Sequence, residues 1–186
     1  MGFTRTFIIA ATLFVAAFAP VAAQTDKGID LENTLYLDVE YGRVVIEMRP
    51  DLAPNHVVRI KELVREGFYD GIVFHRVIDG FMAQTGDPTG TGSGGSGKNL
   101  DAEFSSEKHV RGVVSMARAQ SPNSADSQFF IVFDDAPWLD GQYTAWGRVT
   151  EGMEHIDAIK KGEGQGGSVS NPDAIVKIQI AADVKE

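Results

Sequence analysis

Over most of the chain, apolar and polar residues alternate in short runs, and polar or glycine-containing stretches separate these runs. In the segment 34–40, Leu35, Leu37 and Val39 fall on one face of an extended chain, because successive side chains of a strand point to opposite faces. A turn at Gly42 then predicts a hairpin. The same pattern predicts strands over 34–40, 43–48, 72–78, 82–85, 110–117, 128–133, 143–149 and 174–181.

Two segments instead repeat their apolar residues at helical spacing. The first begins at Pro54, which suits the first turn of a helix, and ends near Gly67. Its apolar stripe consists of Val57, Ile60, Leu63 and Val64. The second spans 151–160, with Met153, Ile156 and Ile159 on one side.

The order of these elements favours a mainly β fold. Helices do not alternate with strands, which argues against a parallel α/β fold. A closed antiparallel barrel of seven or eight strands with two helices fits best. The pattern alone does not distinguish a barrel from a sandwich.

The N-terminal segment has the features of an export signal. Arg5 supplies a positive charge, residues 7–19 are apolar, and small residues precede Gln24. We therefore expect residues 1–23 to be a signal peptide that is cleaved between Ala23 and Gln24.

Cleavage would leave a flexible leader, 24–33, before a domain over 34–186. No stable membrane insertion is expected after it. The alternative is an uncleaved anchor, because the uncharged stretch 6–23 is about long enough to span a bilayer. Either way, the domain is expected outside the cytoplasm.

Composition narrows the function classes. A chain of 186 residues fits one domain with its own core. Its formal net charge of -9 argues against a nucleic-acid partner, because phosphate binding needs a basic face. The absence of cysteine excludes disulfides, thiol catalysis, thiolate metal sites and a lipidated cysteine. No heptad or apolar stripe suggests self-association, so we expect a monomer.

Motifs for hydrolysis, phosphoryl transfer and metal binding are missing. The glycine-rich segment 92–98 resembles a phosphate-binding loop, but Asn99 stands where a serine or threonine would hold Mg²⁺. A surface loop is the simpler interpretation of this segment. The four histidines do not pair at metal-ligand spacing, and no Gly-x-Ser-x-Gly elbow exists. We expect neither a cofactor nor a metal.

Two predicted strands each combine one amide with one large apolar side chain. Met82 and Gln84 share a face of their strand. Gln128 and Phe130 share a face of another strand, and Phe129 is expected on the opposite face. An apolar surface with a few placed hydrogen-bonding groups is what a peptide groove requires.

A charged residue interrupts the predicted strand 72–78. Arg76 is expected to share a face with Phe74 and Ile78. A guanidinium on an apolar face must be paired or must serve a ligand. The residue pattern alone favours a structural role, in which Arg76 is paired within the protein, over contact with a ligand.

Five segments together resemble the cyclophilins. They are FHRVI at 74–78, GFMAQTGD at 80–87, SMARA at 115–119, SQFFI at 127–131 and WLDGQY at 138–143. The resemblance extends from residue 34 to about residue 180 and is closest to exported bacterial members. It implies a closed antiparallel eight-stranded β-barrel capped by two α-helices, and a periplasmic location.

The resemblance also assigns roles. Arg76 matches the catalytic arginine, and Gln84 matches the amide that binds the substrate backbone and positions the arginine. Gln128 supports the same groove. The pocket for the substrate proline ring is matched by Phe81, Met82, Phe130 and Leu139. The remaining groove positions are Ala117, the backbone of Arg118, and Trp138, the rim residue that also contacts cyclosporin.

Two positions depart from the best-known eukaryotic pattern. Tyr143 replaces a histidine, and Arg118 replaces an asparagine. Tyr143 keeps an aromatic side chain with a polar tip, so activity is expected to survive. Cyclosporin binding is expected from Trp138, and its affinity depends on the change at Tyr143.

These residues predict a peptidyl-prolyl cis/trans isomerase that acts on proline-containing polypeptides, exported or unfolded. Rotation of an Xaa-Pro bond needs neither a nucleophile nor a metal, because only the partial double-bond character of the amide resists it. Arg76 is expected to stabilise the twisted amide while the apolar pocket holds the ring. The alternative is a proline-peptide binding module or chaperone with incidental turnover.

Overall fold

The computed structural model describes residues 1–2 and 28–185. The predicted signal peptide, 1–23, lies outside the described residues apart from its first two. The predicted cleavage site and the leader up to residue 27 also lie outside them. Among the residues that are described, no helix is long and apolar enough to cross a membrane.

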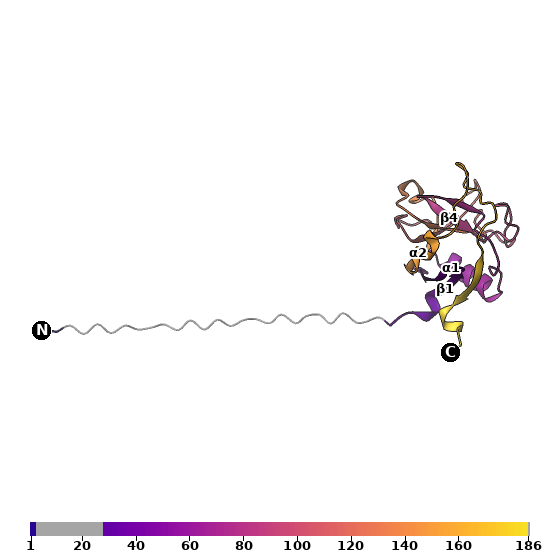
Figure 1. Cartoon of the computed structure of the whole chain (residues 1–186). Helices are drawn as coiled ribbons and strands as arrows, with labels where there is room; N and C mark the ends of the chain where they lie inside the picture. Colours follow the sequence, from indigo (N-terminus) through magenta and orange to yellow (C-terminus); the bar gives the residue numbers. More distant parts are fainter. Residues whose placement is uncertain (3–27, 186) are drawn as a thin grey trace.

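Within the described residues, eight short strands pair into one antiparallel sheet, with the order β3-β4-β6-β5-β7-β2-β1-β8. Two α-helices of the same part of the chain accompany the sheet, α1 (Pro54–Arg65) and α2 (Met153–Asp157), and both are labelled in Figure 1. The strands are β1 (Thr34–Val39), β2 (Gly42–Met48), β3 (Arg76–Ile78), β4 (Met82–Thr85), β5 (Val113–Met116), β6 (Phe129–Val132), β7 (Ala145–Glu151) and β8 (Ile175–Ile180). The predicted mainly β fold with eight strands and two helices is therefore confirmed.

The two edge strands, β3 and β8, approach each other through the residues that precede them. Val73 forms a single antiparallel bridge with Ala174. The Phe74 N–H donates to the Asp173 carbonyl at 2.8 Å, next to that bridge. The sheet is thus curled until its edges meet, but no ladder joins β3 to β8. Full closure of the barrel remains a prediction.

The strand predicted over 72–78 was too long. Only residues 76–78 form β3, because the chain before them leaves the extended pairing to make the bridge at Val73. As a consequence, Phe74 is fully buried in the main core, whereas Ile78 packs on a second apolar cluster. The prediction that Phe74 shares the face of Arg76 and Ile78 was therefore wrong, whereas Arg76 and Ile78, two residues apart in β3, do lie on one face.

Other boundaries shifted by smaller amounts. Strand β7 begins at Ala145 and runs to Glu151, so Tyr143 precedes it and the second helix starts later than predicted. A register shift opposite Asp38 lets Ile175 turn inward although Val176 is exposed, which breaks the alternation expected for β8.

The sheet separates two apolar clusters, and strand β6 contributes to both. Phe129 and Ile131 are buried in the main core with the apolar face of α1. Phe130 and Val132 point the other way, into a smaller cluster that we call the minor core. The minor core consists of Met82, Val113, Phe130, Val132, Ala136, Leu139 and Ala145. The opposite orientation of Phe129 and Phe130 confirms the predicted alternation of this strand.

A buried hydrogen-bonded chain lies beside the minor core. The Nδ1 of His109 lies 3.2 Å from Asp140 Oδ1, and its Nε2 lies 3.1 Å from the Ser115 hydroxyl. Burial lowers the pKa of His109, and the carboxylates of Asp140 and Glu107 oppose this shift. The pKa of Asp140 is lowered to about 2, mainly by a hydrogen bond from the backbone N–H of His109 and then by the Lys108 side chain. At neutral pH these hydrogen bonds therefore join a neutral His109 imidazole to the Asp140 carboxylate.

The neutral state of His109 predicts a loss of stability in mild acid. Its folded-state pKa lies below the 6.5 of an exposed histidine, so the unfolded chain binds the proton first as the pH falls below 6.5. This group alone should lower the free energy of unfolding by up to about 1.4 kcal/mol per pH unit until its folded pKa is reached. The free energy of unfolding of His109→Gln, measured by urea denaturation between pH 7 and about 5, should fall less steeply with decreasing pH than that of the wild type.

Burial also lowers the pKa of His75. The stability of His109→Gln should therefore still depend on pH, but less steeply than that of the wild type. Equal slopes for His109→Gln and the wild type would mean that His109 is not held neutral.

Candidate active site

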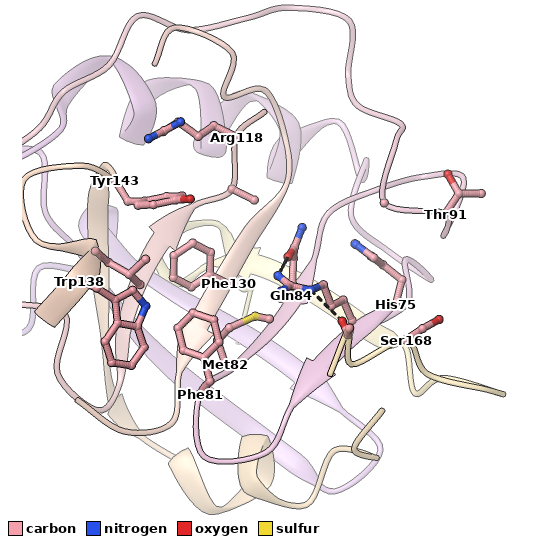
Figure 2. A pocket seen from close by; sticks show the side chains of 15 residues that line it. His75, Phe81, Met82, Gln84, Thr91, Arg118, Phe130, Trp138, Tyr143 and Ser168 are labelled. Carbon is pink, nitrogen blue, oxygen red and sulfur yellow. Dashed lines mark hydrogen bonds between the residues drawn. The ribbon is translucent and has the colours of Figure 1, made fainter. Parts of the chain in front are cut away.

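A cavity of about 500 Å³ opens beside the minor core (Figure 2). Strands β3, β4 and β6 supply its base, and the segments around residues 91, 118, 138 and 166 surround it. Its lining residues are His75, Arg76, Phe81, Met82, Gln84, Thr91, Gly92, Ala117, Arg118, Phe130, Trp138, Leu139, Tyr143, Gly166 and Ser168.

Strand register brings the central residues together. Arg76 of β3 lies opposite Gln84 of β4, and Gln84 lies opposite Phe130 of β6. Opposite residues in an antiparallel pair point to the same face. The three side chains therefore meet in the cavity although 54 positions separate the first from the last.

The guanidinium of Arg76 is held by neutral oxygen atoms. Its Nε donates to the Gly166 carbonyl at 3.0 Å, and its Nη1 donates to Gln84 Oε1 at 3.1 Å. No carboxylate lies within ion-pair distance of Arg76 in the part of the chain that the structure describes. Because a guanidinium has five N–H bonds, about three remain for a ligand in the cavity.

A chain of amides continues from Gln84. Its Nε2 donates to Gln128 Oε1 at 2.9 Å, and Gln128 Nε2 donates to the carbonyls of Gly92 and Gly94 at 3.0 and 2.8 Å. These bonds fix the orientation of the Gln84 amide, so that its oxygen faces Arg76. The glycine-rich segment, predicted to be only a surface loop, therefore supports the site.

An aspartate that precedes that segment, Asp87, holds the backbone that leads into it. Asp87 accepts hydrogen bonds from the N–H groups of Thr89, Thr91 and Gly92, at 2.7, 3.1 and 2.5 Å. Burial would raise the pKa of Asp87, but these bonds outweigh it and hold the pKa well below its usual range. Gly94 must lack a side chain, because a Cβ there would collide with the Asp87 carboxylate.

The apolar side of the cavity combines buried and exposed side chains. Met82, Phe130 and Leu139 are buried, and they form a floor. Phe81 lies against Trp138, with ring centroids 5.5 Å apart, and Trp138 is 59% exposed at the rim. Figure 2 shows Trp138, Phe81, Phe130 and Tyr143 grouped on one side, away from Gln84 and His75. Such a surface suits a compact apolar ring.

Of the predicted site residues, all except Gln128 line the cavity. Gln128 lies behind Gln84 and lines a neighbouring cavity of about 400 Å³ with Arg118 and Asp126. The structure thus assembles the predicted set, while the roles assigned to its members remain predictions.

The structure adds His75, Thr91, Gly92, Gly166 and Ser168 to the lining. His75 is nearly fully buried, and burial lowers its pKa, with Arg76 acting in the same direction and Asp87 against it. Its place beside Arg76 in the FHRVI segment was a usable signal. Gly166 contributes only its carbonyl, and no sequence signal could have identified it.

Hydrolytic and metal chemistry find little support in this cavity. Among residues 1–2 and 28–185, no three histidine, aspartate or glutamate side chains are grouped so that they could hold a metal ion. The lining contains no carboxylate and no serine paired with a base. What the site offers is a fixed cation with spare N–H groups, an oriented amide and an apolar floor.

Comparison with known proteins agrees with this geometry. A family model described as cyclophilin type peptidyl-prolyl cis-trans isomerase/CLD matches residues 34–181. A Brucella suis biovar 1 protein, named "Probable peptidyl-prolyl cis-trans isomerase", is 52% identical over 198 residues and covers 100% of both chains. A Helicobacter pylori peptidyl-prolyl cis-trans isomerase is 41% identical over an alignment of 150 residues, and the match covers 77% of this chain and 91% of the relative.

Solved structures show the same fold. A cyclophilin from Hirschia baltica matches with a TM-score of 0.75 and 30% identity, over 84% of this chain and 77% of the other. A cyclophilin-type isomerase from Cryptosporidium parvum, solved in the presence of the dipeptide Ala-Pro, matches with a TM-score of 0.73 and 32% identity, over 79% and 98% of the two chains. The chain belongs to the cyclophilin-type peptidyl-prolyl cis-trans isomerases.

Proposed function

We propose that this isomerase accelerates rotation about Xaa-Pro bonds by donating a hydrogen bond from Arg76 to the proline nitrogen of the twisted amide. The observation that carries the proposal is the guanidinium itself, which neutral oxygens fix on one side and which lines the cavity with unused N–H groups. The apolar floor of Met82, Phe130 and Leu139 then receives the proline ring.

Such a donor distinguishes the transition state from the ground state. In the planar amide the nitrogen lone pair is delocalised, so it accepts hydrogen bonds poorly. Twisting localises the lone pair, and the nitrogen becomes an acceptor. Only interactions that strengthen in the transition state raise the rate, so an N–H aimed at this nitrogen is catalytic.

The total lowering of the isomerisation barrier is larger than one hydrogen-bond donor supplies. Shortening an event of about 100 s to about 1 ms lowers the barrier by roughly 7 kcal/mol. One preorganised donor in a site shielded from water supplies about 3–4 kcal/mol of this. The remainder is assigned to the floor that grips the ring and to Gln84, whose fixed amide can hold the substrate backbone in the twisted geometry.

A binding module for proline-rich peptides is the second candidate. The open cavity with the exposed rim residue Trp138 favours it, because such a surface binds peptides without any chemistry. Binding alone would not need an arginine whose orientation is fixed by Gln84 and Gly166. The two candidates differ in what the loss of Arg76 should do.

We predict that Arg76→Ala lowers kcat/KM for a short Xaa-Pro peptide by about 10²–10³-fold, while the Kd of the peptide changes little. Arg76→Lys should fall between, because an ammonium keeps the charge but loses the fixed fork. Residues 24–186 should be assayed by exchange NMR, which reports rate and binding in one sample.

Arg49→Ala is the matched control, because this arginine pairs with Asp51 outside the cavity and should leave the rate unchanged. A wild-type protein that binds the peptide without accelerating it would support the binding module. An unchanged rate in Arg76→Ala beside an active wild type would refute the donor role.

Cyclosporin is proposed as a ligand of the same cavity, with Trp138 at its rim. Exposed aromatic residues that become buried on binding often carry much of the binding energy. Trp138→Ala should therefore raise the cyclosporin concentration needed for half-inhibition by about tenfold or more. Tyr41→Ala, at a partly exposed aromatic outside the cavity, is the control. Equal inhibition of Trp138→Ala and the wild type would exclude a contact at the rim.

Export to the periplasm, with unfolded or newly exported chains as substrates, is proposed from the N-terminal sequence. The intact mass of the protein recovered from the periplasm of an expressing bacterium should match residues 24–186. Ala23→Leu should block cleavage, because the signal peptidase requires small residues at this position. Native mass spectrometry of the same sample tests the proposed monomer. A full-length chain retained in the membrane would support the uncleaved anchor.

A further inference from the structure

The side chain of Arg118 connects two segments that border the cavity. It follows β5, and its Nε and Nη2 both donate to the Gln142 carbonyl, at 3.2 and 3.1 Å. Its Nη1 donates to the carbonyls of Ala119 and Gln120, at 3.0 and 3.2 Å. One guanidinium thus joins the chain around residue 119 to the chain around residue 142.

The same guanidinium covers an aromatic ring of the pocket. Its Cζ lies 4.6 Å from the centroid of Tyr143. Tyr143 in turn packs edge-on against Phe130, with centroids 5.9 Å apart and planes at 77°. Figure 2 shows this order, with Arg118 beyond Tyr143 and Tyr143 next to Phe130. The position of Arg118 is therefore transmitted through Tyr143 to the pocket floor.

Hydrogen-bond accounting separates Arg118 from a substrate-binding arginine. Four of its contacts go to main-chain carbonyls, which leaves about one of five N–H bonds unused. Arg76, in the same cavity, uses only two of its five N–H bonds in contacts with the protein. The Arg118 side chain is thus committed to the protein, whereas Arg76 has donors to offer.

We propose that the side chain of Arg118 is a positioning residue for the isomerase reaction. It holds Tyr143 against Phe130 and thereby sets the position of the Tyr143 ring in the proline pocket. It acts on how well the pocket binds the ring, and not on the twisting step. The inference depends on the isomerase activity of the chain and is independent of the role proposed for Arg76.

The test compares KM with kcat for a short Ala-Pro peptide. Arg118→Gln should raise KM roughly 3- to 10-fold, because several modest hydrogen bonds and one cation–π contact are lost. Its kcat should stay within about twofold of the wild type, since the twisting step is unchanged. Arg118→Lys keeps a charge above the ring but loses the fork, so its KM should lie between.

A double-mutant cycle identifies the route through the aromatic ring. If Arg118 acts through Tyr143, then Arg118→Gln should have little further effect on KM in a Tyr143→Leu background. Arg43→Gln is the matched control, because Arg43 also lies 4.6 Å from a tyrosine ring, that of Tyr36, but outside the cavity. This control should leave KM unchanged.

Three results would overturn the proposal. The first is a fall in kcat at unchanged KM. The second is independent, multiplicative effects of the Arg118 and Tyr143 substitutions. The third is a KM increase in Arg118→Gln confined to peptides with glutamate before the proline, which would make Arg118 a substrate contact. Thermal melting of each variant is measured beside the kinetics. A partly unfolded variant would show a lower apparent kcat at unchanged KM, which is the first of the results that count against the proposal.

Discussion

Within the described residues, Arg76 has no carboxylate partner, and this is the constraint around which the site is built. A carboxylate beside Arg76 would neutralise its charge and occupy the N–H groups on which the proposed chemistry depends. The protein therefore orients Arg76 with neutral acceptors, the Gln84 amide oxygen and the Gly166 carbonyl. Neutral acceptors hold a side chain more weakly than a carboxylate, so they must themselves be fixed by the surrounding structure.

That requirement explains features far from the cavity in sequence. The amide of Gln84 is oriented by Gln128, and Gln128 is oriented by the carbonyls of Gly92 and Gly94. Gly166 is fixed through its neighbour Gly167, whose carbonyl accepts from the Val77 N–H at 2.7 Å. Gly167 has a positive φ of 67° and no room for a Cβ against Ile78. Backbone carbonyls of two glycine-rich loops thus support one arginine, one directly and the others through Gln128 and Gln84.

Sequence reasoning succeeded where side chains carry the signal. The alternation of β6 correctly placed Phe130 and Phe129 on opposite faces. Of the residues expected in one groove, Met82, Gln84 and Phe130 line one cavity, whereas Gln128 lines the neighbouring one. Sequence reasoning failed where the backbone carries the structure. The bridge at Val73 shortened β3 and moved Phe74 into the main core, and the Gly166 carbonyl has no side-chain signature. Supporting loops made of glycine are therefore the part of this site that a residue pattern conceals.

The two arginines of the cavity show how identical side chains come to differ in the number of their free N–H groups. Arg76 lies on a strand, where opposite neighbours offer it one amide and leave most of its donors free. Arg118 lies where the chain leaves β5 for a loop, and loops expose carbonyls that no strand partner has satisfied. Those carbonyls take up nearly all of its N–H groups. The number of free backbone acceptors around each guanidinium thus decides how many of its N–H groups remain available in the cavity.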